Sequence, residues 1–168
     1  MSVHRVPSHF VVLLVIAVLG VGPAAWAQGT SVAFGTMQRD TDAPVEVTAE
    51  QLSVDQESGT AIFTGDVLIG QGEMRLAAPR VLVVYKDGRT GIERLEATGG
   101  VTLVSGPDAA ESERADYDID TGVIVMTGNV LLTQGESALT ADRMTVNLDD
   151  GTAQMAGRVK TILQPNRN

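Results

Sequence analysis

The residues of this chain that could do chemistry are two pairs of closely spaced carboxylates. Asp116 and Asp118 stand two positions apart, as residues on one face of a strand do, and Asp149 and Asp150 are adjacent in a turn-like sequence. Paired carboxylates can hydrolyse a glycosidic bond, one acting as the acid and the other as the base or nucleophile. Neither pair has a neighbouring base or set of metal ligands. A carbohydrate-processing enzyme is therefore the weakest of the hypotheses considered.

The residue types needed for most other catalysis are missing. Cysteine is absent, and the two histidines, His4 and His9, both lie in the first ten residues. If that segment is removed, the chain has no imidazole and no thiol, which excludes Ser–His–Asp and Cys–His catalysis and His- or Cys-ligated metals. We therefore predict a protein that is not an enzyme, with no cofactor and no metal site.

The N-terminus has the pattern of a secretory signal peptide. His4 and Arg5 form a polar start, 10–21 is a 12-residue apolar run, and Ala25-Trp26-Ala27 is a small-residue cleavage site. The alternative is an uncleaved anchor, but a spanning helix needs about 20 apolar residues. No later segment could cross a membrane. We expect cleavage after Ala27, with 1–27 removed and the remaining chain exported and soluble.

The charge of the chain argues against nucleic acid as a partner. The whole sequence has a net charge of −9, and loss of Arg5 with the signal makes it −10. Nucleic-acid-binding proteins are usually strongly basic, and an acidic protein is not drawn to anionic membrane surfaces either.

The elements that would position any functional residue are repeated. Residues 59–80 (GTAIFTGDVLIGQGEMRLAAPR) align without a gap with 122–143 (GVIVMTGNVLLTQGESALTADR), 63 positions later. A shorter Thr/Ala-Gly-x-Val pattern occurs at 64–67, 98–101, 127–130 and 156–159. The unit is about 30 residues long, which is typical of stacked supersecondary units that share a continuous core or groove.

The repeats predict antiparallel strands. From Pro44 to about Leu163, short runs rich in Val, Ile, Leu and Thr alternate with turn sequences at 57–59, 87–88, 120–122 and 149–151. We expect a mobile leader over 28–43, a β-domain over 44–164 and a tail over 165–168. A change of phase at the same point in both copies, near Pro79 and its counterpart, indicates a bulge or corner in the strand. The fold is predicted to be all-β, as two antiparallel sheets or one sheet folded over.

One face of these strands is predicted to line a long apolar interior. Successive side chains of a strand point to opposite faces. Because the offset of 63 is odd, the odd-numbered inward positions of the first copy should correspond to even-numbered positions in the second, and they do. The predicted lining is Phe63, Val67, Ile69, Leu76, Val83, Leu95, Val101, Leu103, Ile124, Met126, Val130, Leu132, Leu139, Met144, Val146, Met155 and Val159. Such side chains could fill a core by themselves. They would equally suit flexible hydrocarbon chains.

The repeated array resembles the periplasmic lipopolysaccharide-export bridge family (LptA, OstA-like domain). The resemblance rests on PVEVTAEQLSVDQESGTAIFTGDVLIGQGEMRLAAPRV, ATGGVTLVSG and ERADYDIDTGVIVMTGNVLLTQG, and it covers roughly 44–165. It implies a twisted β-jelly roll with an apolar groove, which binds the acyl chains of lipid A in the periplasm. It also implies docking to an inner-membrane anchor component and an outer-membrane translocon, and head-to-tail homo-oligomers.

An open sheet leaves edge strands that can pair with another chain, and these are the expected docking sites. We predict edges at Val45, Val47, Leu52, Val54, Val159, Thr161 and Leu163. No residue can be assigned to the lipid headgroup: five arginines, at positions 75, 80, 94, 114 and 143, are candidates, but solvated strand-edge charges explain them better. The alternative to a lipid carrier is a self-assembling β-repeat scaffold with a filled core and no cargo.

Overall fold

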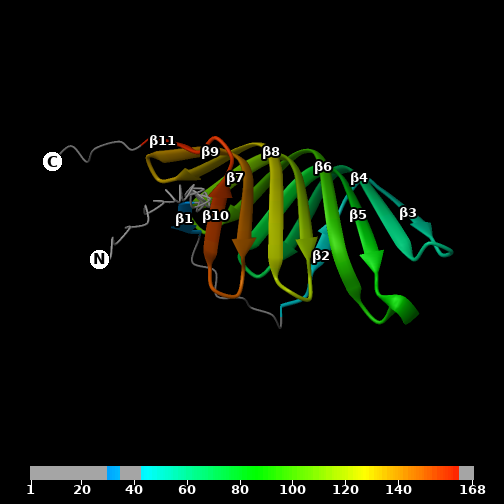
Figure 1. Cartoon of the computed structure of the whole chain (residues 1–168). Helices are drawn as coiled ribbons and strands as arrows, with labels where there is room; N and C mark the ends of the chain where they lie inside the picture. Colours follow the sequence, from blue (N-terminus) through cyan, green and yellow to red (C-terminus); the bar gives the residue numbers. More distant parts are fainter. Residues whose placement is uncertain (1–29, 35–42, 163–168) are drawn as a thin grey trace, which may run out of the picture.

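The computed structural model describes residues 30–34 and 43–162, and these residues form eleven strands and one short 3₁₀ helix (Figure 1). The strands are β1 Thr30–Ala33, β2 Glu46–Thr48, β3 Gln51–Asp55, β4 Thr60–Gln71, β5 Met74–Tyr85, β6 Ile92–Ser105, β7 Asp108–Asp118, β8 Val123–Gln134, β9 Ser137–Asn147, β10 Thr152–Ala156 and β11 Lys160–Ile162, and the helix η1 is Asp87–Arg89. Within this part of the chain no helix is long and apolar enough to cross a membrane. The predicted signal peptide and tail lie outside the described residues.

All the strands belong to one antiparallel sheet, which confirms the all-β prediction in its single-sheet form. The order is β1-β10-β9-β8-β7-β6-β5-β4-β2, with β3 also paired to β4 and β11 also paired to β9. Most neighbours in the sheet are neighbours in the sequence, because hairpins join them. The exceptions are β2, which pairs with β4, β11, which pairs with β9, and β1, which lies beside β10 at the far end of the sheet from β2.

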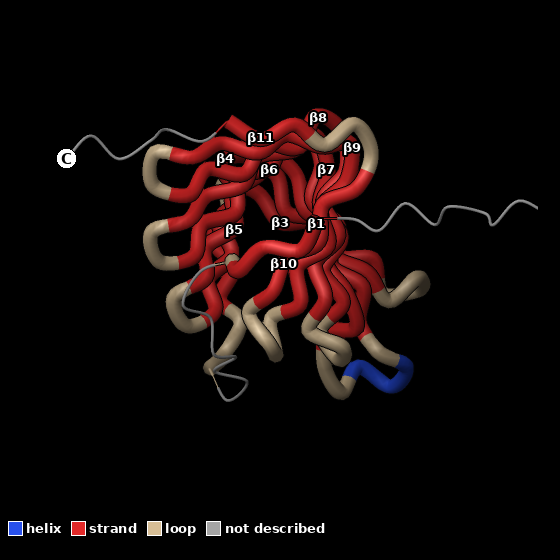
Figure 2. The backbone as a smooth tube through the Cα atoms, turned by 60° about the vertical axis from the view of Figure 1, so that its left-hand side comes forward, coloured by secondary structure: helices blue, strands red, loops and turns tan. Residues whose placement is uncertain are grey.

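The sheet bends over on itself along one line, which we call the crease. Each long pair of strands breaks register there, for example between Thr64 and Val67 and between Thr127 and Val130. The breaks divide the strands into two facing walls (Figure 2). The first wall contains 30–33, 51–55, 60–64, 80–85, 92–98, 114–118, 123–127, 143–147 and 152–156, and the second contains 46–48, 67–71, 74–78, 101–105, 108–112, 130–134, 137–141 and 160–162. The phase change in the sequence correctly predicted this corner.

Glycine makes the crease possible. Gly65 and Gly128 have φ angles of +82° and +83°, a region that L side chains rarely adopt. A side chain at Gly128 would also collide with Glu113, whose carboxylate lies over the glycine. The repeated Thr-Gly-x-Val pattern therefore encodes a bulge at which each strand passes from one wall to the other.

The turns at the free ends of the first wall fall where the sequence predicted them. Gly59, Gly122 and Gly151 have positive φ, and Asp87 and Gly88 lie in η1 between β5 and β6. Asp118 accepts the main-chain N–H of Thr121 at 2.8 Å, which fixes the turn before β8.

The predicted mobile leader over 28–43 is wrong where the structure describes it. Thr30–Ala33 pairs with β10 over four residues, and Phe34 is fully buried. Burial of the phenyl ring and closure of the β10 edge together favour order in this short segment. The segment is rich in Gly, Thr and Ser, and it lacks the alternation of apolar and polar residues that would have predicted the strand β1.

Candidate functional site

The candidate site is the apolar interior between the two walls. Fifteen of the seventeen residues predicted to line it are at most 5 % exposed. They are Val67, Ile69, Leu76, Val83, Leu95, Val101, Leu103, Ile124, Met126, Val130, Leu132, Leu139, Met144, Val146 and Met155. The inward face that strand alternation predicted is therefore the face that the structure buries. Whether it contacts lipid stays a prediction.

The other two predicted lining residues lie at the ends of the sheet. Phe63 is only partly buried, although it packs against the core. Val159 is 37 % exposed, so the prediction that it lines the interior is wrong. It follows Gly157 where the chain last passes the crease, between β10 and β11, and among the described residues no strand beyond β11 covers it. The Thr/Ala-Gly-x-Val pattern predicted for Val159 the same inward position as for Val67. The sheet, however, ends before Val159 can be enclosed.

The two walls touch directly across the interior. Tyr117 in β7 belongs to the first wall and Gln71 in β4 to the second, and the Tyr117 hydroxyl donates to Gln71 Oε1 at 2.8 Å. The lining side chains are only a few per cent exposed, so the two walls pack against each other along the interior.

The two ends of the interior differ. At the β3 end, Leu52 and Val54 pair with inward-facing Phe63 and Ala61, yet they are 57 % and 59 % exposed. At the β10 end, Phe34 closes the interior, and its main-chain N–H donates to Gly151 O at 3.0 Å. The interior is therefore uncovered at one end and plugged at the other.

Several interior residues are absent from the predicted lining. Phe34 and Tyr117 are among the largest fully buried side chains, and Met74, Val81, Leu148 and seven alanines complete the core. Tyr117 could have been found, since it lies two positions after buried Ala115 on one strand face. Phe34 carried no periodic signal, because it follows a strand of four residues.

The predicted docking edges are unpaired on their outer sides in the described residues. At one end, β2 and β3 form the edge, and at the other, β11 does. Val45 and Val47 are half-buried, whereas Leu52, Val54 and Thr161 are exposed. Leu163 lies outside the described residues. The strand β10, which was not among the predicted edges, is covered by β1.

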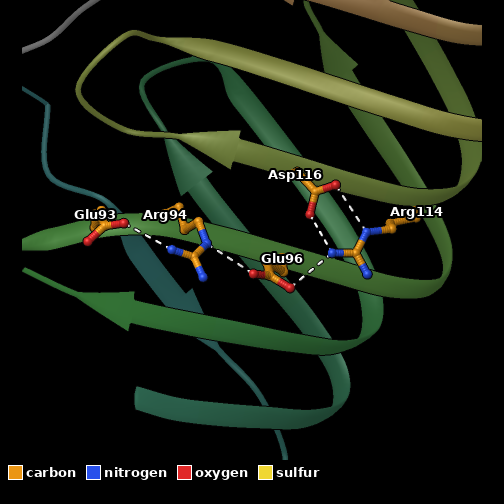
Figure 3. A network of polar contacts seen from close by, with 5 residues as sticks. All are labelled: Glu93, Arg94, Glu96, Arg114 and Asp116. Atoms are coloured by element: carbon orange, nitrogen blue, oxygen red, sulfur yellow. Dashed lines mark hydrogen bonds and ion pairs between the residues drawn. The ribbon is translucent and has the colours of Figure 1, made fainter. Parts of the chain in front are cut away.

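Charged residues gather on the outside of the sheet. Five of them form a network of ion pairs, in the order Glu93, Arg94, Glu96, Arg114 and Asp116. Each arginine lies between two carboxylates, with N···O distances of 2.7 to 3.0 Å (Figure 3). Hydrogen bonds to Asp116 and then Glu96 raise the pKa of Arg114, and those to Glu96 and Glu93 raise the pKa of Arg94. These two arginines are thus held by neighbouring acids, as the solvated-charge interpretation expects.

The carboxylates of both pairs have structural partners within the described residues. Asp116 binds Arg114, while the Thr121 N–H lowers the pKa of Asp118. Asp150 accepts the N–H of Thr152 at 3.0 Å in the turn before β10. Across residues 30–34 and 43–162, no group of His, Cys, Asp and Glu could hold a metal ion. The arrangement can bury apolar surface and pair edge strands, and neither capacity involves a reaction.

Comparisons with known proteins agree with this description. The family model described as LptA/(LptD N-terminal domain) LPS transport protein matches residues 46–152, more than half of the chain. An uncharacterized protein of Rhizobium meliloti (strain 1021) is 32 % identical over 123 residues, which span 66 % of each chain. The lipopolysaccharide export system protein LptA of Escherichia coli (strain K12) is 33 % identical over 60 residues, spanning 36 % of this chain and 32 % of that protein.

A solved structure shares the fold. LptH, the LptA-homologous periplasmic component of the lipopolysaccharide transport device of Pseudomonas aeruginosa, superposes with a TM-score of 0.67. The match covers 75 % of this chain and 99 % of that one, at 17 % identity. The predicted OstA-like β-jelly roll is confirmed. The matched family is one of transport proteins, as the prediction of a non-enzymatic protein requires.

Proposed function

This chain belongs to the LptA/LptD N-terminal domain family of LPS transport proteins, and on that premise we propose that it is a periplasmic carrier of lipopolysaccharide. In this proposal the acyl chains lie between the two walls, and the protein passes the lipid from the inner to the outer membrane as part of a multi-protein export machine. The signal peptide, cleaved after Ala27, would deliver it to the periplasm.

The observation that supports the proposal is the continuous apolar interior, which runs through the sheet from β3 to β10. Each CH₂ group exposed to water costs about 0.8 kcal/mol, so an acyl chain of roughly a dozen carbons costs on the order of 10 kcal/mol. An interior lined by aliphatic and thioether side chains removes that cost and adapts to flexible chains. Carriage of this kind needs no chemistry from the protein.

The proposed partners dock at the sheet edges. An inner-membrane anchor component and an outer-membrane translocon would each add an edge strand, to β2–β3 or to β10–β11, and line up their interiors with this one. Further copies of this chain could lengthen the bridge in the same head-to-tail way, because such a heterologous contact does not close on itself.

A filled-core scaffold without cargo is the second candidate, and one observation favours it: the interior side chains already pack against each other to near-zero exposure. Calorimetric titration of the purified protein separates the two functions. A carrier binds lipopolysaccharide but not its deacylated core oligosaccharide. A scaffold binds neither, and equal binding of both would place the site outside the apolar interior.

A further inference from the structure

Among the described residues, three polar side chains are buried in the otherwise apolar interior. They are Ser105, Asp108 and Ser112, at 0 %, 8 % and 8 % exposure, and they lie on the neighbouring strands β6 and β7 of the second wall. A polar group that leaves water destabilises the fold unless it gains a hydrogen-bond partner. The partners of these three side chains therefore show which of them the fold itself accounts for.

Two of the three have a partner and the third does not. The Ser112 hydroxyl donates to the main-chain carbonyl of Arg114 at 2.9 Å, and Asp108 Oδ2 accepts from Gln134 Nε2 at 2.9 Å. The Ser105 hydroxyl is the one buried side-chain polar atom in the described part of the chain that has no hydrogen-bond partner. An unpaired buried hydroxyl costs free energy, and a ligand that supplies the missing partner removes that cost.

Ser105 lies where the two walls meet opposite the crease, along a line that we call the seam. It is the last residue of β6, with its side chain inward, and the strand register puts it in one row with Gln71 and Gln134 across the second wall. Both glutamines contact the first wall: Gln71 accepts from Tyr117 at 2.8 Å, and Gln134 donates to Ala33 O at 2.6 Å. The seam is therefore the border between the apolar interior and the turns at the free end of the second wall.

The side chains at the seam favour a neutral polar group. Ser105 and Asp108 face each other in the β6–β7 register, so their side chains are neighbours on one face of the sheet. A carboxylate repels phosphate and carboxylate groups, and it accepts several hydrogen bonds but donates none. The serine hydroxyl can donate. A group that fits both residues offers an acceptor to Ser105 and a donor to Asp108, as a carbonyl with a nearby hydroxyl does.

We propose that Ser105 and Asp108 form a binding site for the polar root of a hydroxylated acyl chain. The Ser105 hydroxyl donates to the acyl carbonyl oxygen, and Asp108 accepts from the hydroxyl of the chain. The hydrocarbon runs from there into the apolar interior, and the headgroup lies outside the seam. This inference rests on the proposed function, because it specifies which part of the lipid these two residues recognise.

Two probes that differ by one hydroxyl test the ligand. They are N-(β-hydroxymyristoyl)glucosamine and N-myristoylglucosamine, each titrated into the purified protein in a calorimeter below its critical micelle concentration. We expect the hydroxylated probe to bind with a Kd lower by roughly three- to tenfold, which is the contribution of one hydrogen bond. Equal affinities of the two probes would overturn the proposal.

The variant Ser105→Ala tests the site. It should weaken binding of both probes by roughly three- to tenfold, because both carry the carbonyl. It should also raise the melting temperature of the protein without ligand, by roughly 2 to 5 °C, because it removes an unpaired buried hydroxyl. A serine with a purely structural role would lower the melting temperature when replaced.

Ser112→Ala is the matched control. Ser112 is the other buried serine of the interior, but its hydroxyl has a partner in the main chain. We therefore expect Ser112→Ala to lower the melting temperature and to leave the affinity for both probes unchanged.

The remaining outcomes separate this inference from the proposed function. A Ser105→Ala variant that melts at or below the wild-type temperature, or that binds both probes as the wild type does, would overturn the inference alone. If lipopolysaccharide binds and neither probe does, the inference also fails and the proposed function stands. If neither lipopolysaccharide nor a probe binds, both fail.

Discussion

The hydroxyl of Tyr117 donates a hydrogen bond to the side-chain oxygen of Gln71 at 2.8 Å, and this bond joins the two walls across the apolar interior. The amide of Gln71 donates in turn to the carbonyl of Ala43 at 3.3 Å, just before β2. A polar link between the facing walls resists their separation.

Tyr117→Phe should remove this link and leave the ring in place. We expect a loss of about 1 kcal/mol in the free energy of unfolding, the usual net value of one hydrogen bond, measured by urea denaturation. Tyr85→Phe is the matched control, because the described residues provide no partner for its hydroxyl. An equal loss in both variants would mean that the cross-wall bond does not contribute.

Gly128→Ala should destabilise the crease. A Cβ there would lie 2.6 Å from Glu113 Oε2 and 2.8 Å from Glu113 Cβ, on a backbone with φ of +83°. Gly135→Ala is the control, since its φ is +57° and no heavy atom lies within 4 Å of the added carbon. We expect Gly135→Ala to lower the free energy of unfolding by about 1 kcal/mol and Gly128→Ala to lower it by roughly 2 to 3 times as much. Equal unfolding midpoints would contradict the close packing of Glu113 over the crease.

The turn carboxylates predict how stability depends on pH. The Thr121 N–H lowers the pKa of Asp118, and the Ser58 N–H does the same for its repeat counterpart Asp55, from an ordinary value of 3.8. A carboxylate whose pKa is lower in the folded state stabilises the fold above the unfolded pKa, and that contribution is lost as pH falls through the folded pKa.

Asp118→Asn should therefore lower the melting temperature at pH 6, and its effect should shrink as the pH falls below about 3.8, because the wild-type carboxylate is protonated first in the unfolded state and then, at lower pH, in the folded state. Melting curves of both proteins between pH 6 and pH 2.5 measure this. A difference that stays constant over the whole range would mean that the charge of Asp118 is not what fixes the turn.

Leu52→Asp should weaken assembly and leave the fold unchanged. Leu52 is 57 % exposed on the β3 edge, and substitution of so exposed a residue typically changes stability by within about 0.5 kcal/mol. A charge on an edge strand opposes pairing with another chain. Leu68→Asp is the control: Leu68 is 42 % exposed but lies in β4, which is already paired on both sides and is not an edge strand. Cross-linking that is reduced equally in both variants would place the contact elsewhere.

Period-two alternation and a gapless repeat were sufficient to predict the strands, the crease and the inward face. Met126 and Val130 were correctly assigned because each repeat copy checked the parity of the other. Phe34 and β1 could not be predicted, since a four-residue strand carries almost no periodic signal and its partner is about 120 residues away. The prediction that Val159 lines the interior was wrong for a related reason. Its local motif does mark the crease, but whether the side chain is buried depends on where the sheet ends.

The measurement that tests the central claim most directly is photocrosslinking in cells, with a photoreactive residue in place of Met126 and a control in place of Asn129. Met126 is fully buried between the walls, whereas Asn129 lies on the outer side of the crease. The account predicts a lipopolysaccharide adduct at position 126 and none at 129. A folded, exported protein with no adduct at 126, or with equal adducts at both positions, would contradict carriage of the lipid between the walls.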